Sequence, residues 1–371
     1  MSWLSWHERS ERLASDAHVY ARRGDHEGAL RLFAEAAAAE SRALDELDAS
    51  KSRTLGITSV SAVSLWFKAH EFSRAEQLAL RGLSSLKLPQ FAVDQARALL
   101  QAIWTAQAMG DASVSFLPGQ VFVAVRGGQT VTGGAPLDLI VEKVQTVQAL
   151  FYRTIEFMKH VPHRKRGAPS IEIQEACRPW LFQAPAGSYQ FSVAIQEPQQ
   201  PDFFKDAGPQ PEQVAVHFMS ILKASSEDPT DQLPELVHSE EYRSTFLKLA
   251  RNLAPTGKNF SQVEVRSADE TQGISLSPEN RKEINLALRP QGPKTETQEK
   301  TSTELRGVLR ALNLEKDWLE VLLTDGQIVH VDGLNEAVDD VIGPMVNRPV
   351  IVQVKRKPRG RWQFQDIEPE D

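Results

Sequence analysis

The chain has 371 residues, of which 41% are hydrophobic and 25% charged, and its formal net charge at neutral pH is −7. This length predicts two or three domains, and the composition is that of an ordinary soluble globular protein. The negative balance argues against a general affinity for nucleic acid, and a single cysteine excludes both a disulfide framework and a multi-cysteine zinc site. No signal peptide or membrane span is evident, so we expect a cytoplasmic protein.

The first third of the chain has a helical pattern. Residues 12–47 are rich in alanine, arginine and glutamate, with apolar residues at steps of three and four, and Gly24-Asp25 interrupts the pattern once. This predicts a helix–turn–helix. A weaker copy follows, with His70 at the position of the glycine, and Phe91–Ala108 is predicted as a further helix.

The first copy resembles a tetratricopeptide repeat. The residues that carry the resemblance have the spacing of its small, aromatic and glycine positions: Ala17, Tyr20, Gly24, Ala29, Phe33 and Ala36, with Trp66 and Ala75 in the second copy. The copies are further apart than the roughly 34 residues of a regular repeat, which indicates a longer second helix. The resemblance implies a helical domain over residues 1–110 whose concave face binds a peptide or another protein. The alternative is two repeats that only pack against the next domain.

Residues 113–289 are predicted to form one α+β domain, an antiparallel sheet packed on a long helix. Its centre is a strand at Val121–Val125, a glycine-rich turn at Gly127–Gly134 and a helix from Pro136 to about His160. Alternating residues predict a hairpin with one buried face and one face that is wet or weakly covered. The other predicted strands are Ile171–Ile173, Trp180–Phe182, Tyr189–Ile195, Phe260–Arg266 and Ile284–Leu288, and the other predicted helices are Gln213–Ala224 and Leu233–Leu253.

Residues 290–303 are a linker by composition, with two prolines and no large apolar residue. Residues 304–371 follow as a small β-barrel. Three strands, a short helix at Leu334–Ile342 and two more strands match the element order of an OB-type barrel, and an SH3-like barrel fits nearly as well.

Catalytic motifs are scarce. The turn at Gly127–Gly134 precedes a helix, as phosphate loops do, but it lacks the lysine of a P-loop, so a plain connection is expected. Cys177 lacks a family signature and is expected in a core, while His160 and His163 stand beside three basic residues that oppose a metal. We therefore predict no catalytic residue, no cofactor and no metal.

Two basic clusters are candidates for nucleic-acid contacts. One is the loop His160–Arg166. The other joins the last two predicted strands, where an OB barrel often grips single strands. Its candidate contacts are Lys355, Arg356, Lys357, Arg359, Arg361 and Trp362. A solvated hairpin tip that prevents edge-to-edge pairing of sheets is the competing interpretation.

Together these patterns predict a cytoplasmic, bacterial, non-enzymatic adaptor or regulatory subunit of an assembly such as one in toxin control or phage defence. Its helical module would hold a protein partner, and a tethered barrel would make a second contact. The alternatives are a nucleic-acid-binding regulator that uses the barrel loop and an enzyme that uses Cys177.

Overall fold

The structure is a computed structural model of the whole chain, and it divides into two compact units. The first is Met1–Ser115 with Phe182–Gln190, and the second is Phe116–Leu181 with Phe191–Asp371. The residues described are 2–48, 50–85, 87–112, 115–117, 119–131, 134–182, 189–197, 213–267, 273–288, 302–334, 338–357 and 360–370. The predicted linker therefore lies outside them, except for its last two residues, which begin a strand of the barrel.

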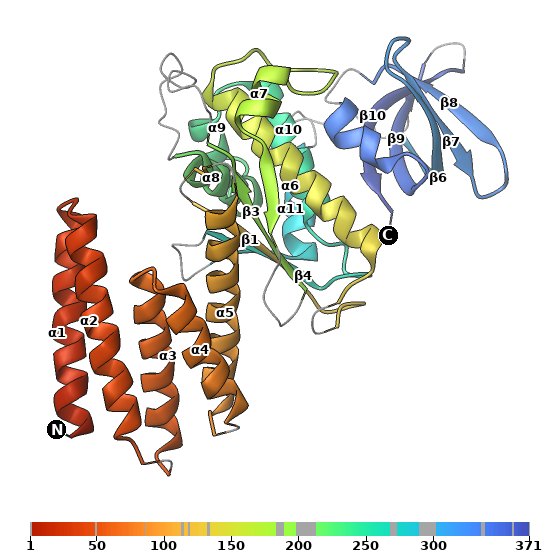
Figure 1. The fold of residues 1–371 in the computed structure, drawn as a ribbon. Coiled ribbons are helices and arrows are strands. Elements are labelled where there is room, and N and C mark those ends of the chain that lie inside the picture. Colours follow the sequence, from red (N-terminus) through yellow and green to blue (C-terminus); the bar gives the residue numbers. More distant parts are fainter. Residues whose placement is uncertain are drawn as a thin grey trace. The chain divides into compact units, whose positions relative to one another are not determined.

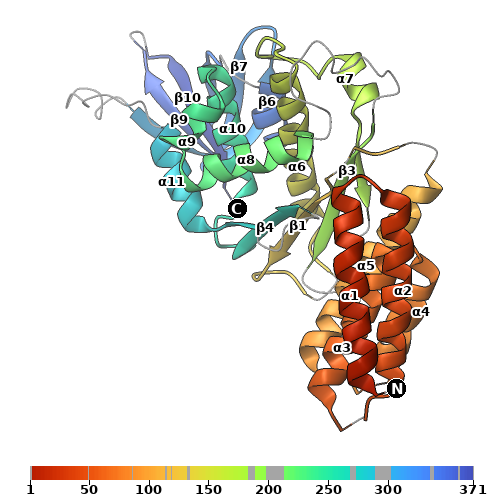
Figure 2. The same ribbon diagram turned by 90° about the vertical axis from the view of Figure 1, so that its left-hand side faces the viewer.

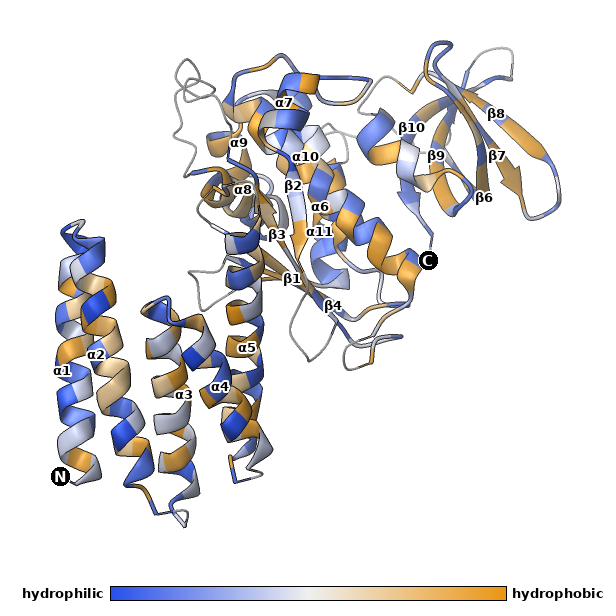
Figure 3. Cartoon of the chain, viewed as in Figure 1, coloured by the Kyte–Doolittle hydropathy of each residue, from blue (hydrophilic) through white to orange (hydrophobic). Residues whose placement is uncertain are grey.

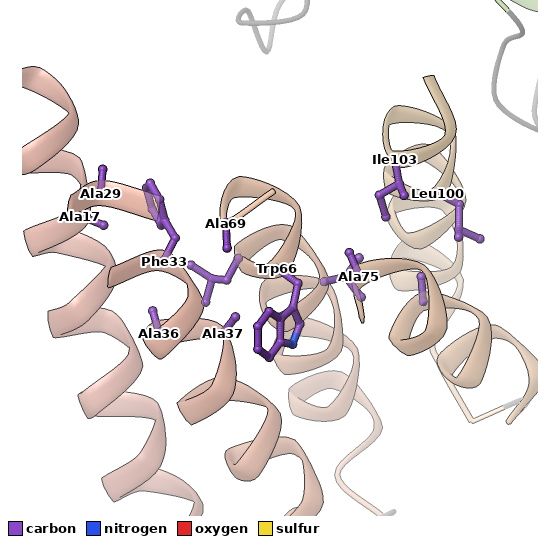
Figure 4. Close-up of a cluster of buried hydrophobic side chains, with 13 residues drawn as sticks. Ala17, Ala29, Phe33, Ala36, Ala37, Trp66, Ala69, Ala75, Leu100 and Ile103 are labelled. Atoms are coloured by element: carbon purple, nitrogen blue, oxygen red, sulfur yellow. The ribbon is translucent and has the colours of Figure 1, made fainter. Parts of the chain in front are cut away.

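The first unit is a stack of helices in chain order (Figure 1). They are α1 (Trp3–Arg22), α2 (His26–Asp45), α3 (Ser52–Lys68), α4 (Phe72–Ser84) and α5 (Gln90–Asp111). Small residues allow the helices to approach closely: Ala17, Ala36 and Ala75 are fully buried. Phe33 and Trp66 fill the space between neighbouring helices, as Figure 4 shows. The helical N-terminal region is thus confirmed.

The second unit contains a five-stranded sheet beside a layer of helices (Figure 2). The strand order is β2-β3-β1-β4-β5, and the β1–β4 and β4–β5 pairs are antiparallel. The strands are β1 (Val121–Arg126), β2 (Pro179–Phe182), β3 (Gln190–Ile195), β4 (Gln262–Ser267) and β5 (Ile274–Leu276). Apolar colour runs along β1 and β3 in Figure 3. The prediction of one wet or weakly covered face is wrong for β3, because Ser192 and Ala194 are as buried as Phe191 on the other face.

The long predicted helix is present as α6 (Leu137–Met158). It packs on α8 (Val214–Glu227) through stacked rings of Phe151 and Phe218, whose centroids are 4.1 Å apart. It also packs on α10 (Glu240–Leu253), where Phe157 lies edge-on to Tyr242. The apolar stripe of α6 therefore contacts helices as its main neighbours.

Three predictions for this unit are wrong, each because a cap outweighed a hydrophobic pattern. Ile171–Ile173 begins a helix, α7 (Ile171–Ala176), because the Ser170 hydroxyl accepts a bond from the backbone N–H of Ile173. The supposed strand at Ile284–Leu288 ends the helix α11 (Pro278–Leu288), which a Ser277–Asn280 capping box starts. The supposed single helix Leu233–Leu253 is two, α9 (Gln232–Leu236) and α10, because Ser239 caps a new start.

The C-terminal residues form a closed five-stranded barrel in the order β10-β8-β7-β6-β9. All neighbouring pairs are antiparallel except β8–β10, which is parallel. A short helix lies between the third and fourth strands, as expected, in the form of a π-helix at Val338–Ile342 followed by a 3-10 helix at Gly343–Met345. The strands are β6 (Ser302–Asn313), β7 (Trp318–Leu323), β8 (Ile328–Asp332), β9 (Pro349–Arg356) and β10 (Trp362–Pro369).

Candidate functional site

The two helical hairpins of the first unit have matching turns. Gly24 has φ +82°, and His70, at the equivalent place in the second hairpin, has φ +60°. In each turn a backbone N–H bonds a carbonyl five residues back, Asp25 to Tyr20 and Glu71 to Trp66. A left-handed histidine costs more than a left-handed glycine, so packing must hold the second turn in place. The weaker second copy thus has the same local geometry as the first.

Most signature residues of the resemblance are core residues. The alanines, Phe33 and Trp66 are buried, and the Trp66 indole N–H donates to the Ser41 hydroxyl at 3.0 Å. Tyr20 differs, with 38% of its surface exposed. These residues therefore hold the helices together, and, apart from Phe33, the surface that could bind a ligand consists of other side chains.

That surface is a groove at the α3–α4 turn, and we call it the aromatic groove. It has two adjoining compartments, of about 390 Å³ and about 620 Å³, that share His70, Phe72 and Ala106. The smaller is lined also by His18, Phe33, Phe67 and Lys68. The larger is lined also by Glu71, Ser73, Gln107, Gly110 and Asp111.

The aromatic side chains that line the smaller compartment contact one another. His18 lies edge-on to Phe33 with centroids 5.1 Å apart, and Phe72 packs on Phe67 at 5.8 Å and on His70 at 5.6 Å. These rings come from α1, α2, α3 and α4 and from the turn between the last two. An aromatic surface of this kind suits a large apolar or aromatic side chain.

The charges around the groove are separated. Lys68 extends its ammonium over the Phe33 ring, 5.7 Å from the centroid. Partial burial lowers the pKa of His18, and the nearby positive charges of Lys68 and Arg22 lower it further. The carboxylates of Glu71 and Asp111 belong to the other compartment only. One end of the groove is therefore cationic and the other acidic.

Sequence reasoning missed the groove residues because helical periodicity marks positions that are buried against a neighbouring helix. Phe67 and Phe72 are only partly buried. The only available signal was the density of rings and histidines around the turn, from Phe67 to Phe72. Ala106 carried no signal at all.

The barrel loop predicted to contact nucleic acid forms the β9–β10 hairpin. Lys355, Arg356, Lys357 and Arg361 are exposed, and the Arg356 guanidinium lies 5.5 Å from the centroid of Trp362. Among the described residues none of these four cations forms an ion pair. Arg359 lies outside the described residues. Four cations and a ring are thus grouped at one end of the barrel.

The outer face of β7 and β8 carries charge of the opposite sign. His330 lies between two carboxylates, 3.3 Å from Glu320 and 3.2 Å from Asp332, and its ring packs on Trp318 with centroids 4.8 Å apart. Next to them Ile328 is 59% exposed. Carboxylates on this face would repel a phosphate backbone.

The other basic cluster, His160–Arg166, contacts acidic residues of the barrel. Arg164 pairs with Glu156 at 2.8 Å and with Asp340 at 3.0 Å, and Arg166 pairs with Asp317. The fully buried Arg153 of α6 also binds Asp340, at 2.6 Å. This cluster is therefore a contact between the α+β part and the barrel within one unit.

A second group of buried charges continues this contact. Arg251 of α10, fully buried, binds the Asp366 carboxylate and the Ile367 carbonyl, and Arg281 binds Glu368 at 2.9 Å. Burial alone would raise the pKa of Asp366, but the Arg251 charge holds that pKa below its usual value. Burial lowers the pKa of the neighbouring Lys248 to about 8. Ion pairs thus join the barrel to the helices of the same unit. The sequence alone had indicated a barrel held to the rest of the chain by a linker.

The other residues considered for catalysis or ligand binding have structural roles. Cys177 is fully buried, and burial raises the pKa of its thiol to about 12, so the thiol is protonated at neutral pH. The His163 ring bonds the Thr245 hydroxyl at 2.9 Å. In the glycine-rich turn, a Cβ on Gly127 or Gly128 would collide with Ser261 or Asn259, so close packing explains both glycines.

Within the described residues, no three His, Cys, Asp or Glu side chains are grouped so as to hold a metal ion. The helices of the described parts of the chain all lack the length or the apolar character that crossing a bilayer requires. Compared with known proteins, the chain matches no family model, no curated protein and no solved structure.

Proposed function

We propose that the protein is a cytoplasmic, non-enzymatic adaptor or regulatory subunit that holds a protein partner on its helical unit. The observation that carries this proposal is the aromatic groove. It offers a hollow lined by aromatic rings, and separated charges, on a scaffold of five packed helices. The matching turns at Gly24 and His70 support a tetratricopeptide-like identity for this unit.

The surroundings of Cys177 argue against its use as a nucleophile. A thiolate is the reactive form, and a pKa of about 12 leaves almost none of it near neutral pH. This favours binding over catalysis for the chain as a whole. An adaptor in a bacterial assembly, for toxin control or phage defence, remains our proposal for the setting.

The adaptor is tested by affinity purification of the tagged full chain from its host, with and without nuclease, followed by mass spectrometry. We expect a stoichiometric protein that survives nuclease and is lost from a Phe67→Ala variant. Only nucleic-acid-associated proteins, all removed by nuclease, would contradict the adaptor.

A second candidate is nucleic-acid binding by the barrel. The strand order and the parallel β8–β10 pair favour an OB-type barrel over an SH3-like one. Four exposed cations lie in the β9–β10 hairpin, and one of them, Arg356, is 5.5 Å from the Trp362 ring. The carboxylates beside His330 oppose it. Lys355→Glu with Arg361→Glu should abolish binding of a single-stranded oligonucleotide, and wild-type affinity should fall steeply with salt. Unchanged binding by this double variant would exclude the barrel loop.

A further inference from the structure

We propose that the aromatic groove takes a peptide segment in which one aromatic or large aliphatic side chain stands between an acidic and a basic residue. This inference rests on the proposed adaptor function and specifies the chemistry of the partner. It depends on the order of three features along the groove, which are a cation, a set of rings and a pair of carboxylates.

The smaller compartment provides the anchor site. Phe33, Phe67 and Phe72 line it, with Phe67 and Phe72 packed on each other, and the small side chain of Ala106 completes the lining. A hollow of about 390 Å³ holds one large side chain of a peptide. An aromatic anchor gains both apolar burial and edge-to-face contacts there.

The cationic end selects an acidic neighbour. Lys68 is exposed, and its ammonium is held over Phe33 next to the compartment where the anchor would sit. Arg22, whose charge together with that of Lys68 lowers the pKa of His18, adds positive potential at the same end. A carboxylate adjacent to the anchor side chain would therefore be attracted to this end.

The acidic end selects a basic neighbour. Glu71 and Asp111 line the larger compartment beyond the His70–Phe72 wall. Glu71 forms a long, exposed ion pair with Arg74, with 3.8 Å between nitrogen and oxygen. A lysine or arginine of a bound peptide can take the place of Arg74 at little cost in free energy. These carboxylates also disfavour a polyanion as the occupant, so a peptide fits the groove better than a nucleic acid.

The test uses the full chain and a displayed library of decapeptides with a fixed central phenylalanine and randomised flanks. Wild-type protein should enrich peptides with acidic residues on one side and basic residues on the other. In direct titration such a peptide should bind about 10-fold more tightly than versions with both flanks acidic or both basic. The version with glycine in place of phenylalanine should not bind measurably.

Charge reversal in the protein shows whether the groove charges themselves select the charged residues of the peptide or whether a substitution only disturbs the fold. Lys68→Glu should shift enrichment to peptides with two basic flanks, and Glu71→Lys with Asp111→Lys to peptides with two acidic flanks. Lys51→Glu, at the other end of α3, is the matched control and should keep the wild-type preference. Circular dichroism should show that all three variants are folded, because every substituted side chain is exposed.

The inference and the adaptor fail in different ways. A nuclease-resistant partner that copurifies with both charge-reversed proteins, with no enriched charge order in the library, would overturn the inference and leave the adaptor standing. Absence of a copurifying protein together with an unenriched library would overturn both.

Discussion

The aromatic groove of the helical unit and the contact between barrel and helices in the other unit both concentrate charge, but they use it differently. In the contact, Arg153 and Arg251 are fully buried, and each is paired with a carboxylate. In the groove, Lys68 is exposed and lies over a ring, while the carboxylates stand at the opposite end. Charges already paired inside a protein maintain its fold, whereas separated charges at a surface remain available to a partner.

The largest effect is expected at Arg251. Arg251→Ala leaves the Asp366 carboxylate and the Ile367 carbonyl without their donor, so the free energy of unfolding should fall by about 3–5 kcal/mol. Urea denaturation followed by tryptophan fluorescence measures this change. Arg306→Ala, which removes surface pairs with Glu304 and Glu370, is the control and should cost about 0–1 kcal/mol. Equal losses in the two variants would contradict the distinction between buried and surface pairs.

Acid should weaken the unit that contains the barrel. Burial and the charge of Arg153 lower the pKa of His163 from 6.5 to about 4, so the folded state binds fewer protons than the unfolded state between these values. The contribution of His163 to the free energy of unfolding is therefore fully present above pH 6.5 and is lost as the pH falls toward 4. With allowance for partial exposure, the loss is about 1–3 kcal/mol.

His163→Gln, which keeps a polar partner for Thr245, should flatten the pH dependence of the unfolding free energy between pH 6.5 and 4. Urea denaturation at three pH values in this range provides the comparison. The same slope in both proteins would show that another group titrates there.

The helical unit contains a pair in which one partner, Glu40, is fully buried. This pair tests whether the cost of losing an ion-pair partner follows burial or the unit in which the pair lies. Glu40 is fully buried and lies 3.0 Å from His7. His7→Ala should cost about 1–3 kcal/mol because the carboxylate loses its partner. Glu11→Ala, which removes the exposed neighbour of the same histidine, should change the free energy of unfolding by less than about 0.5 kcal/mol. A neutral His7→Ala would mean that Glu40 is satisfied in some other way.

The smallest effect on stability is expected in the groove itself. Lys68→Ala should change the free energy of unfolding by less than about 0.5 kcal/mol, because Lys68 is exposed and its ammonium lies 5.7 Å from the centroid of the Phe33 ring without an ion pair to any described residue. Thermal unfolding of the variant checks this. A loss comparable to that of Arg251→Ala would place Lys68 among the residues that maintain the fold.

Predictions from the sequence succeeded where one local rule decided the outcome. The apolar stripe along α6 predicted a helix to within two residues of each observed end, and the barrel strands followed from alternation and turn residues. They failed at Ile171 and Ile284, where short apolar patterns fit two structures and the caps at Ser170 and Ser277 decided between them. The α9–α10 break at Ser239 was missed for the same reason.

The candidate site was predictable only in outline. The resemblance placed binding on the helical unit, but of the residues that carry it only Phe33 is among those that line the groove. Phe67, Lys68 and Phe72 became candidates only when neighbouring helices placed them around one hollow.

The sequence by itself determined the kinds of elements and their order, because periodicity and turn chemistry act over a few residues. Only the tertiary structure decided which charges are paired and which are exposed. Arg153 and Asp340 are 187 positions apart, yet they form a buried ion pair. The ammonium of Lys68, in contrast, lies over the ring of Phe33. Coulomb interactions depend on distance and burial in space, and neither can be read from position along the chain.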